Sequence, residues 1–289
     1  MPELPEVETI RRGLAEHLTG RTVTSVEGAG ARLVRNNPGG LPQLTTALLG
    51  AQIRSVERRG KFMWLVLDGN AEDAVVIHLG MSGQVRTAKR PQKDLERHEH
   101  LRLRLSDGRA VRFFDVRMFV HVTATDLVED KTGRLVPAIA THIAPDLLEL
   151  KDRGAIETLA TRFSSSRRAV KVLLLDQGLT SGIGNIYADE SLFRTGTHGA
   201  HSASDLGVPE LGKILRAARD VMGQAVKVGG TSFDELYVDV DGNPGYFERE
   251  LRVYGRRGRP CRSCGTLISR EVIGGRSHFF CPACQPAPG

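Results

Sequence analysis

Four cysteines near the C-terminus constrain the fold of this chain more than any other feature. They form two C-x2-C pairs separated by sixteen residues: Cys261, Cys264, Cys281 and Cys284. Each pair can place two thiolates on one metal ion at a tight turn, and this spacing is typical of a zinc ribbon. Two disulfides are the alternative, but thiols stay reduced in the cytosol, where we expect the chain to reside. The pattern therefore predicts one structural zinc ion whose four thiolate ligands leave no position open for chemistry.

The same C-terminal segment is strongly basic. Residues 251–289 contain seven arginines and one acid, Glu271, and their net charge of +6 equals that of the whole 289-residue chain. Such a segment favours a polyanionic partner, most simply nucleic acid, although a solvated run of charge explains it equally well.

The remaining composition is ordinary for a globular protein, with 40% hydrophobic and 26% charged residues. The first residues are acidic and proline-rich, unlike a secretory signal, and the apolar runs are too short to span a membrane. We expect a soluble, cytoplasmic, monomeric protein with no membrane partner.

Residues 22–123 show the patterns of β-structure. Leucines alternate with arginines over residues 101–105, and Asp107-Gly108 marks a hairpin turn before the alternation resumes. Several such short runs, separated by glycines, predict a sandwich or flattened barrel rather than βαβ units.

Helical periodicity dominates after a weakly patterned region that contains Pro137 and Pro145. The clearest helix begins at Pro209 and ends at Gly229-Gly230, and shorter helices fit 153–162, 168–176 and 186–194. We therefore expect an α+β multidomain chain with these parts: a β domain at 1–130, a linker at 131–150, a helical domain at 151–250 and a zinc finger at 251–289.

The opening MPELPEVETI combines a helix start with a second feature. Apolar residues from Val7 to Leu18 recur at helical spacing, and Pro5 suits the first turn, which accounts for Pro5 and Glu6. Pro2 and Glu3 precede that pattern. If Met1 is removed, Pro2 presents a secondary amine that can attack a sugar carbon, with Glu3 beside it as a general acid/base. Simple helix-start geometry is the alternative explanation of the pair.

Five stretches form a joint pattern: MPELPEVET, HLGMSG at 78–83, SGIGNIYADESLF at 181–193, DGNPGYF at 241–247, and VYGRRGRPCRSCG leading into the cysteines. Together they resemble the formamidopyrimidine-DNA glycosylases, bacterial enzymes that excise 8-oxoguanine and ring-opened purines. The resemblance covers essentially the whole chain in the right order. It implies an N-terminal β-sandwich with an N-terminal helix, then a helical domain with a helix–two-turn–helix motif and a zinc-ribbon finger. Damaged double-stranded DNA is the implied partner, and no organic cofactor is expected.

The same resemblance implies roles for catalytic residues. Pro2 would be the Schiff-base nucleophile, Glu3 the proton donor at the sugar, and Glu6 a second acid near the lesion. Lys61 would assist β-elimination, and Arg276 would bind phosphate and assist δ-elimination. Without the resemblance, Lys61 fits a solvent-facing lysine at a strand entry, and Arg276 a solvated finger arginine.

Four further residues are expected to contact DNA phosphates. Two of them, His98 and Arg167, match DNA-gripping positions of the family. Lys171 lies four residues after Arg167, so we expect the two to share a helix face toward the same backbone. Asn185 follows SGIG at an expected helix N-terminus, where free N–H groups favour a phosphate. A dinucleotide-binding loop is excluded there because no strand precedes it and its third glycine is missing.

An enzyme that acts on a base within a duplex must extrude that nucleotide, and other side chains then fill the gap. The resemblance assigns this task to Met81, Arg117 and Phe119. The sequence departs from the family here: DVRMFV stands at 115–120 where DPRRFG is expected, which leaves the rigidity of the loop open. The segment 229–247, rich in Gly, Asp and Tyr, is expected to close over the lesion.

Two other functions remain open at this point. One is an endonuclease VIII-like glycosylase for oxidised pyrimidines, which uses the same amine chemistry. The other is a non-catalytic zinc-ribbon protein that binds DNA and needs no free Pro2 amine.

Overall fold

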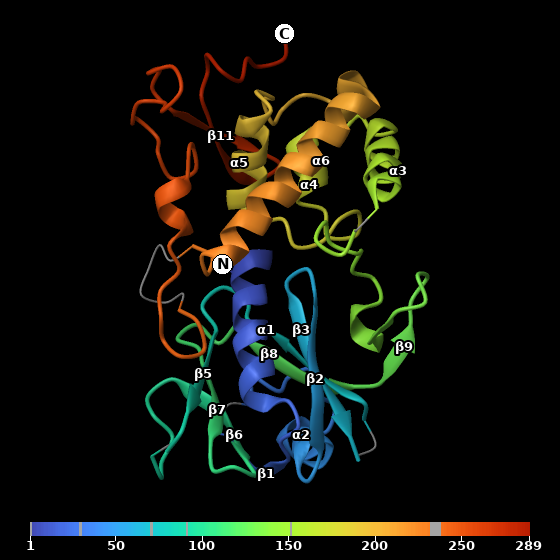
Figure 1. Cartoon of the computed structure of the whole chain (residues 1–289), viewed down its shortest axis with the longest axis vertical. Coiled ribbons are helices and arrows are strands. Elements are labelled where there is room, and N and C mark those ends of the chain that lie inside the picture. Colours follow the sequence, from blue (N-terminus) through green and yellow to red (C-terminus); the bar gives the residue numbers. More distant parts are fainter. Residues whose placement is uncertain (1, 29–30, 70–71, 91, 151, 232–237) are drawn as a thin grey trace. The chain divides into compact units, whose positions relative to one another are not determined.

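The computed structural model describes residues 2–28, 31–69, 72–90, 92–150, 152–231 and 238–289 (Figure 1). The chain forms two compact units. The first comprises Met1–His142 and Gly229–Tyr246, and the second Ile143–Val228 and Phe247–Gly289. The segment Gly229–Tyr246, which the sequence places with the helices, therefore belongs to the first unit.

Two four-stranded antiparallel sheets make up most of the first unit. One sheet has the strand order β2 (Gln52–Arg59), β3 (Phe62–Asp68), β4 (Ala74–His78) and β8 (His121–Thr125). The other has the order β1 (Val23–Gly28), β6 (Glu99–Leu105), β7 (Ala110–Phe114) and β5 (Gln84–Ala88). Apolar side chains of both sheets share one core, which confirms the predicted sandwich. The turn at Asp107-Gly108 joins β6 to β7, and Gly108 has the positive φ of +83° that glycine permits.

The predicted N-terminal helix is α1 (Leu4–Leu18), drawn in blue in Figure 1. It packs along β2, and its apolar residues, from Val7 to Leu18, enter the sandwich core. The expectation of β-structure throughout 22–123 is wrong at α2 (Gly40–Leu48). That helix has nine residues, and its Leu44, Ala47 and Leu48 pack into the core. Their helical spacing spans too few residues to be recognised as a helix in the sequence.

The end of the first unit contains regular structure that the sequence did not indicate. A short hairpin, β9 (Leu127–Glu129) and β10 (Leu135–Pro137), precedes the single turn η1 (Ala138–Ala140). Arg59 anchors this hairpin, because its guanidinium pairs with the turn residue Asp130 at 2.5 Å.

The second unit contains the helices α3 (Arg153–Ser164), α4 (Val170–Leu174), α5 (Asn185–Arg194) and α6 (Ala203–Lys227). α3 and α5 pack against α6. α6 has a break at Gly207 (φ 70°, ψ 164°), and the continuous part after it begins near Pro209, as predicted. No described helix has the length and apolar character needed to cross a membrane.

The C-terminal part of the second unit is the zinc ribbon. The turn η2 (Phe247–Glu250) leads toward it, and its hairpin consists of β11 (Ser269–Ile273) and β12 (Arg276–Phe280). Gly274 and Gly275 make the connecting turn with φ of +55° and +75°, the left-handed values that a tight two-residue hairpin requires.

Candidate functional site

The first turn of α1 holds the predicted catalytic acid in a defined position. Pro2 is buried, and Glu3 caps the helix. The Glu3 amide donates to Glu6 Oε2 at 2.9 Å, one half of a capping box that satisfies N–H groups at the helix start. Glu3 and Glu6 are 3% and 6% exposed, so two carboxyl groups lie buried beside Pro2 in sequence.

Glu6 also ties α1 to a distant segment of the first unit. Its Oε1 accepts hydrogen bonds from the Thr231 amide at 2.8 Å and the Thr231 hydroxyl at 3.0 Å. A Cβ on Gly230 would lie 2.7 Å from Glu6 Oε1, and the φ of Gly230 is +78°, so only glycine fits there. Thr231 immediately precedes residues 232–237, which belong to the expected lesion-covering segment and lie outside the described residues.

Lys61 lies half-buried in the turn between β2 and β3. A stacked pair of histidines occupies the ends of the adjoining strands: His78 lies 4.9 Å from His121 and 4.6 Å from Phe62, measured between ring centroids. Burial lowers the pKa of both histidines to about 4, and the charge of Lys61 contributes at His78. Both rings are therefore neutral at pH 7. Sequence reasoning passed over His78, although it opens the quoted motif HLGMSG.

Asp115 organises the loop that departs from the family pattern. Its Oδ1 accepts from the Ser82 hydroxyl (2.5 Å) and the Arg117 amide (3.0 Å), and its Oδ2 from the amides of Phe119 (2.5 Å) and Val120 (2.7 Å). Burial opposes ionisation, but these hydrogen bonds outweigh it and hold the pKa of Asp115 below its usual value. The carboxylate thus restrains the loop from Arg117 to Val120, which stands where the family's glycine is missing.

The three expected gap-filling residues lie together at this loop. Met81, Arg117 and Phe119 are all exposed. The Arg117 side chain donates to the Met81 carbonyl at 3.1 Å, and its guanidinium lies 5.8 Å from the Phe119 ring centroid. His98 is also joined to this loop, because its carbonyl accepts the Asp115 amide at 3.0 Å.

Replacing Asp115 by Asn is expected to destabilise the first unit by about 2 kcal/mol. An amide offers one acceptor oxygen, so its NH₂ group would oppose N–H donors that the carboxylate now satisfies. Urea denaturation measures the change. Asp126→Asn, at an exposed aspartate of the same unit, serves as the matched control. Equal stability of the two variants would show that Asp115 does not hold the loop.

The four cysteines of the second unit converge on one point. Their Sγ atoms all lie within 4.8 Å of one another, and Cys264 Sγ is 3.4 Å from Cys281 Sγ and 3.5 Å from Cys284 Sγ. These separations are too long for disulfides, whose S–S bonds are about 2.05 Å. They are close to the edge of about 3.8 Å of a zinc tetrahedron with 2.3 Å bonds. The four thiolates therefore suit a single structural zinc ion.

Removing the metal is expected to unfold the ribbon while the helices persist, because thiolates without their cation no longer hold the two turns together. Limited proteolysis after chelation should cut within 258–287 first. Metal analysis should give one zinc per chain before treatment and none in Cys281→Ser. A ribbon that resists protease after complete loss of zinc would contradict a metal-dependent fold.

Lys171 requires a correction. Its side chain is 0% exposed, and Nζ donates to Asp189 Oδ1 at 2.6 Å and to the Ser277 carbonyl at 2.5 Å. The expectation that Lys171 and Arg167 share a helix face toward DNA is wrong, because α4 begins at Val170 and the Lys171 ammonium is buried in an ion pair.

Asp189 extends this network to the zinc ribbon. Its Oδ1 lies 2.7 Å from His278 Nδ1, and its Oδ2 accepts the Phe279 amide at 2.9 Å. The adjacent Glu190 accepts the amides of residues 252–254 at 2.9–3.0 Å, and burial raises its pKa. Sequence reasoning missed both acids, although they lie in the quoted SGIGNIYADESLF. They anchor β12 and the start of the basic segment to α5.

The remaining predicted residues of the second unit are accessible. Arg276 is exposed as the first residue of β12, directly before the anchored Ser277. Arg167 is exposed between α3 and α4. Asn185 begins α5, and its buried Oδ1 has no hydrogen-bond partner in the described part of the chain.

Comparison with known proteins places the whole chain in one family. Three family models match in order: the formamidopyrimidine-DNA glycosylase N-terminal domain over 1–122, the H2TH domain of the same family over 143–236, and the zinc finger found in FPG and IleRS over 258–287. Among curated relatives, the formamidopyrimidine-DNA glycosylase of Mycolicibacterium gilvum is 49% identical over 290 residues, covering 100% of this chain and 99% of the relative. That of Nocardia farcinica is 46% identical over 297 residues, with the same coverage.

Solved structures of the same family are similar to this chain over essentially its whole length. The MutM (Fpg) protein of Thermus thermophilus has a TM-score of 0.81 at 34% identity, with both chains covered completely. A Lactococcus lactis FPG variant bound to DNA containing Fapy-dG has a TM-score of 0.83 at 30% identity, covering 99% of this chain and 100% of that one.

The chain combines a β-sandwich, preceded by buried acidic residues, with a helical unit and a four-cysteine zinc finger. Together with the family matches, these features define a DNA glycosylase of base excision repair. The chain belongs to the formamidopyrimidine-DNA glycosylase family.

Proposed function

We propose that this protein removes oxidised purines, 8-oxoguanine and formamidopyrimidines, from duplex DNA and then cleaves the strand as an AP lyase. The observation that carries the proposal is the start of α1, where Pro2 directly precedes Glu3, the buried residue that caps the helix. The Lactococcus lactis complex with Fapy-dG DNA supports the choice of lesion.

The chemistry begins at Pro2 after removal of Met1. The amine nitrogen attacks the sugar C1′, the glycosidic bond breaks, and a proton supplied by Glu3 opens the sugar ring. The resulting iminium withdraws electrons from C2′, so loss of a C2′ proton expels the 3′ phosphate in β-elimination. A second elimination then expels the 5′ phosphate. Lys61 assists the first elimination, and Arg276 assists the second by binding phosphate.

Recognition of damaged DNA is assigned to exposed and half-buried residues of both units. His98, Arg167 and Asn185 contact phosphates, which position the duplex without reading sequence. Met81 and Phe119 fill the gap left by the extruded nucleotide, and Arg117 offers a fork of donors to the orphaned cytosine. The basic segment 251–289 supports a polyanionic partner. We propose that the protein acts as a monomer.

Borohydride trapping tests the proposal. The purified protein is mixed with an 8-oxoguanine:cytosine duplex, and peptide mapping locates the adduct. We expect a covalent adduct at Pro2 and cleaved DNA. Trapping on a duplex with an oxidised pyrimidine, and not with 8-oxoguanine, would favour the endonuclease VIII-like specificity. Absence of an adduct on either duplex, with Met1 confirmed absent, would favour a non-catalytic DNA-binding protein.

A further inference from the structure

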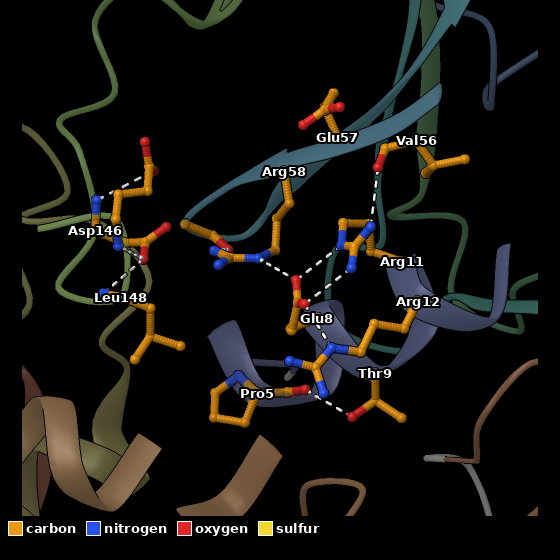
Figure 2. Close-up of polar contacts among 12 residues, drawn as sticks. Pro5, Glu8, Thr9, Arg11, Arg12, Val56, Glu57, Arg58, Asp146 and Leu148 are labelled. Atoms are coloured by element: carbon orange, nitrogen blue, oxygen red, sulfur yellow. Dashed lines mark hydrogen bonds and ion pairs between the residues drawn. The ribbon is translucent and has the colours of Figure 1, made fainter. Parts of the chain in front are cut away.

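Glu8 is the centre of a charged network in the first unit (Figure 2). Its Oε2 accepts from Arg58 Nε at 3.0 Å and Arg11 Nε at 2.9 Å, and its Oε1 accepts from Arg12 Nε at 2.8 Å. Burial disfavours the charged carboxylate, but the hydrogen bonds and charges of Arg11 and Arg58 outweigh it and lower the pKa of Glu8 to about 2. Glu8 is therefore ionised at neutral pH.

Arg58 carries this network to the turn that holds Lys61. Its side chain is 7% exposed, near the end of β2, and its Nη1 donates to the Gly60 carbonyl at 3.0 Å. Gly60 has a φ of +56° and directly precedes Lys61. One guanidinium thus joins a carboxylate of α1 to the backbone of the β2–β3 turn.

A second contact keeps α1 in register with β2. Arg11 Nη1 donates to the Val56 carbonyl at 3.1 Å, as Figure 2 shows. At the N-terminus of α1, the capping box fixes Glu3. Glu8 follows Glu3 by five residues, which is about 7.5 Å along a helix axis. The network therefore lies within two helical turns of Pro2 and one residue from Lys61.

The contribution of the Glu8–Arg58 ion pair to the stability of the fold does not explain why the pair is buried here. Taking two charges out of water costs about as much free energy as their attraction returns, so a buried pair is weak evidence of stability. Arg54 offers a comparison on the same strand: its partner is Asp68 at 3.3 Å, and both side chains are half exposed. Arg58 differs in its burial and in its reach to the turn.

We propose that Glu8 and Arg58 are positioning residues that fix the β2–β3 turn against α1, so that Lys61 meets the intermediate formed on Pro2. The inference rests on the proposed function, because it takes the roles of Pro2 and Lys61 from there. In this proposal Glu8 and Arg58 act through Lys61 and not by contact with the substrate.

The test uses the full-length protein and a duplex that already contains an abasic site, so that base excision is bypassed. Two quantities are measured: the yield of borohydride-trapped adduct and the single-turnover rate of strand cleavage. Arg58→Met keeps the apolar stem and removes the donors. We expect its cleavage rate to fall by about 10- to 100-fold, while the adduct yield stays equal or rises because the intermediate persists. Arg54→Met, the matched control, should behave as the unmodified protein.

A second pair of variants separates positioning from folding. Lys61→Ala and the double variant Lys61→Ala/Arg58→Met should cleave at the same rate, because Arg58 acts through the lysine that is gone. Glu8→Gln and Arg58→Lys, which retain part of the network, should show the same split between adduct and cleavage to a smaller degree. If urea denaturation shows that Arg58→Met does not fold, Glu8→Gln and Arg58→Lys are used to test the proposal in its place.

An equal fall in adduct yield and cleavage in a folded Arg58 variant would overturn the inference. So would an additive loss in the double variant, or cleavage unchanged from Arg54→Met. Failure of the unmodified protein to form any adduct would instead refute the proposed function, which keeps the two failures distinct.

Discussion

Protein that retains Met1 in front of Pro2 is expected to lose covalent trapping on abasic DNA by at least about 100-fold, while it still binds the DNA. Retention has two effects. It converts the Pro2 nitrogen into an amide with no nucleophilic lone pair, and it moves the nearest free amine along the chain by one residue, about 3.8 Å. Neither effect alters the folded core, because α1 begins only at Leu4.

Pro2→Gln provides the retained form, since initiator methionine stays in place before a bulky second residue, and mass spectrometry confirms it. Pro2→Gly is the control: Met1 is removed, a primary amine stands at the same position, and some trapping should remain. DNA binding by a fluorescence titration at fixed salt should be similar in both. Full trapping by the Met1-containing protein would exclude Pro2 as the nucleophile.

Lys171→Met is expected to destabilise the second unit by about 3–5 kcal/mol. The substitution leaves Asp189 charged and buried without its ammonium partner, and it removes the hydrogen bond to the Ser277 carbonyl. The same change should loosen β12 and hence Arg276, which directly precedes Ser277. Thermal and urea denaturation, with the zinc content held constant, measure the loss.

Lys213→Met is the matched control, because Lys213 forms an exposed pair with Glu210 on α6, and its loss should change stability by less than about 1 kcal/mol. Removing the lone charge as well, as in Lys171→Met/Asp189→Asn, should recover part of the stability, because the neutral side chain still offers an oxygen to the Phe279 amide. An unchanged stability of Lys171→Met, together with weaker DNA binding that depends less on salt, would contradict this explanation. That result would support the original expectation that Lys171 contacts a phosphate directly.

Much of the local structure could be predicted because its causes are local. The cysteine spacing, the apolar periodicity of α1 and the Asp-Gly turn between β6 and β7 each depend on residues close together in the chain. Helix α2 escaped prediction because nine residues with three buried side chains give too little periodicity to distinguish from a strand.

The missed site residues have a different cause. Asp115, Glu8 and Arg58 act through partners that are distant in sequence or aligned by a loop, and no spacing rule identifies such partners. The burial of Lys171 is of the same kind. The spacing of four residues between Arg167 and Lys171 suggested that they share a helix face. In the structure, the Lys171 ammonium instead bonds Asp189 on α5 and the Ser277 carbonyl on β12.

The sequence by itself determined the zinc ribbon, the helix that starts behind Pro2 and Glu3, the β-then-helical order of the chain and, through its joined motifs, the family. These features follow from residue identity and short-range spacing, which fix backbone preference and metal chemistry without reference to distant parts. Only the tertiary structure decided which charges are buried and what they hold: Asp115 a loop, Lys171 and Asp189 a strand of the ribbon, Arg58 the turn before Lys61. The physical reason is that burial and hydrogen bonding depend on which distant segments meet, and that is settled only when the core packs.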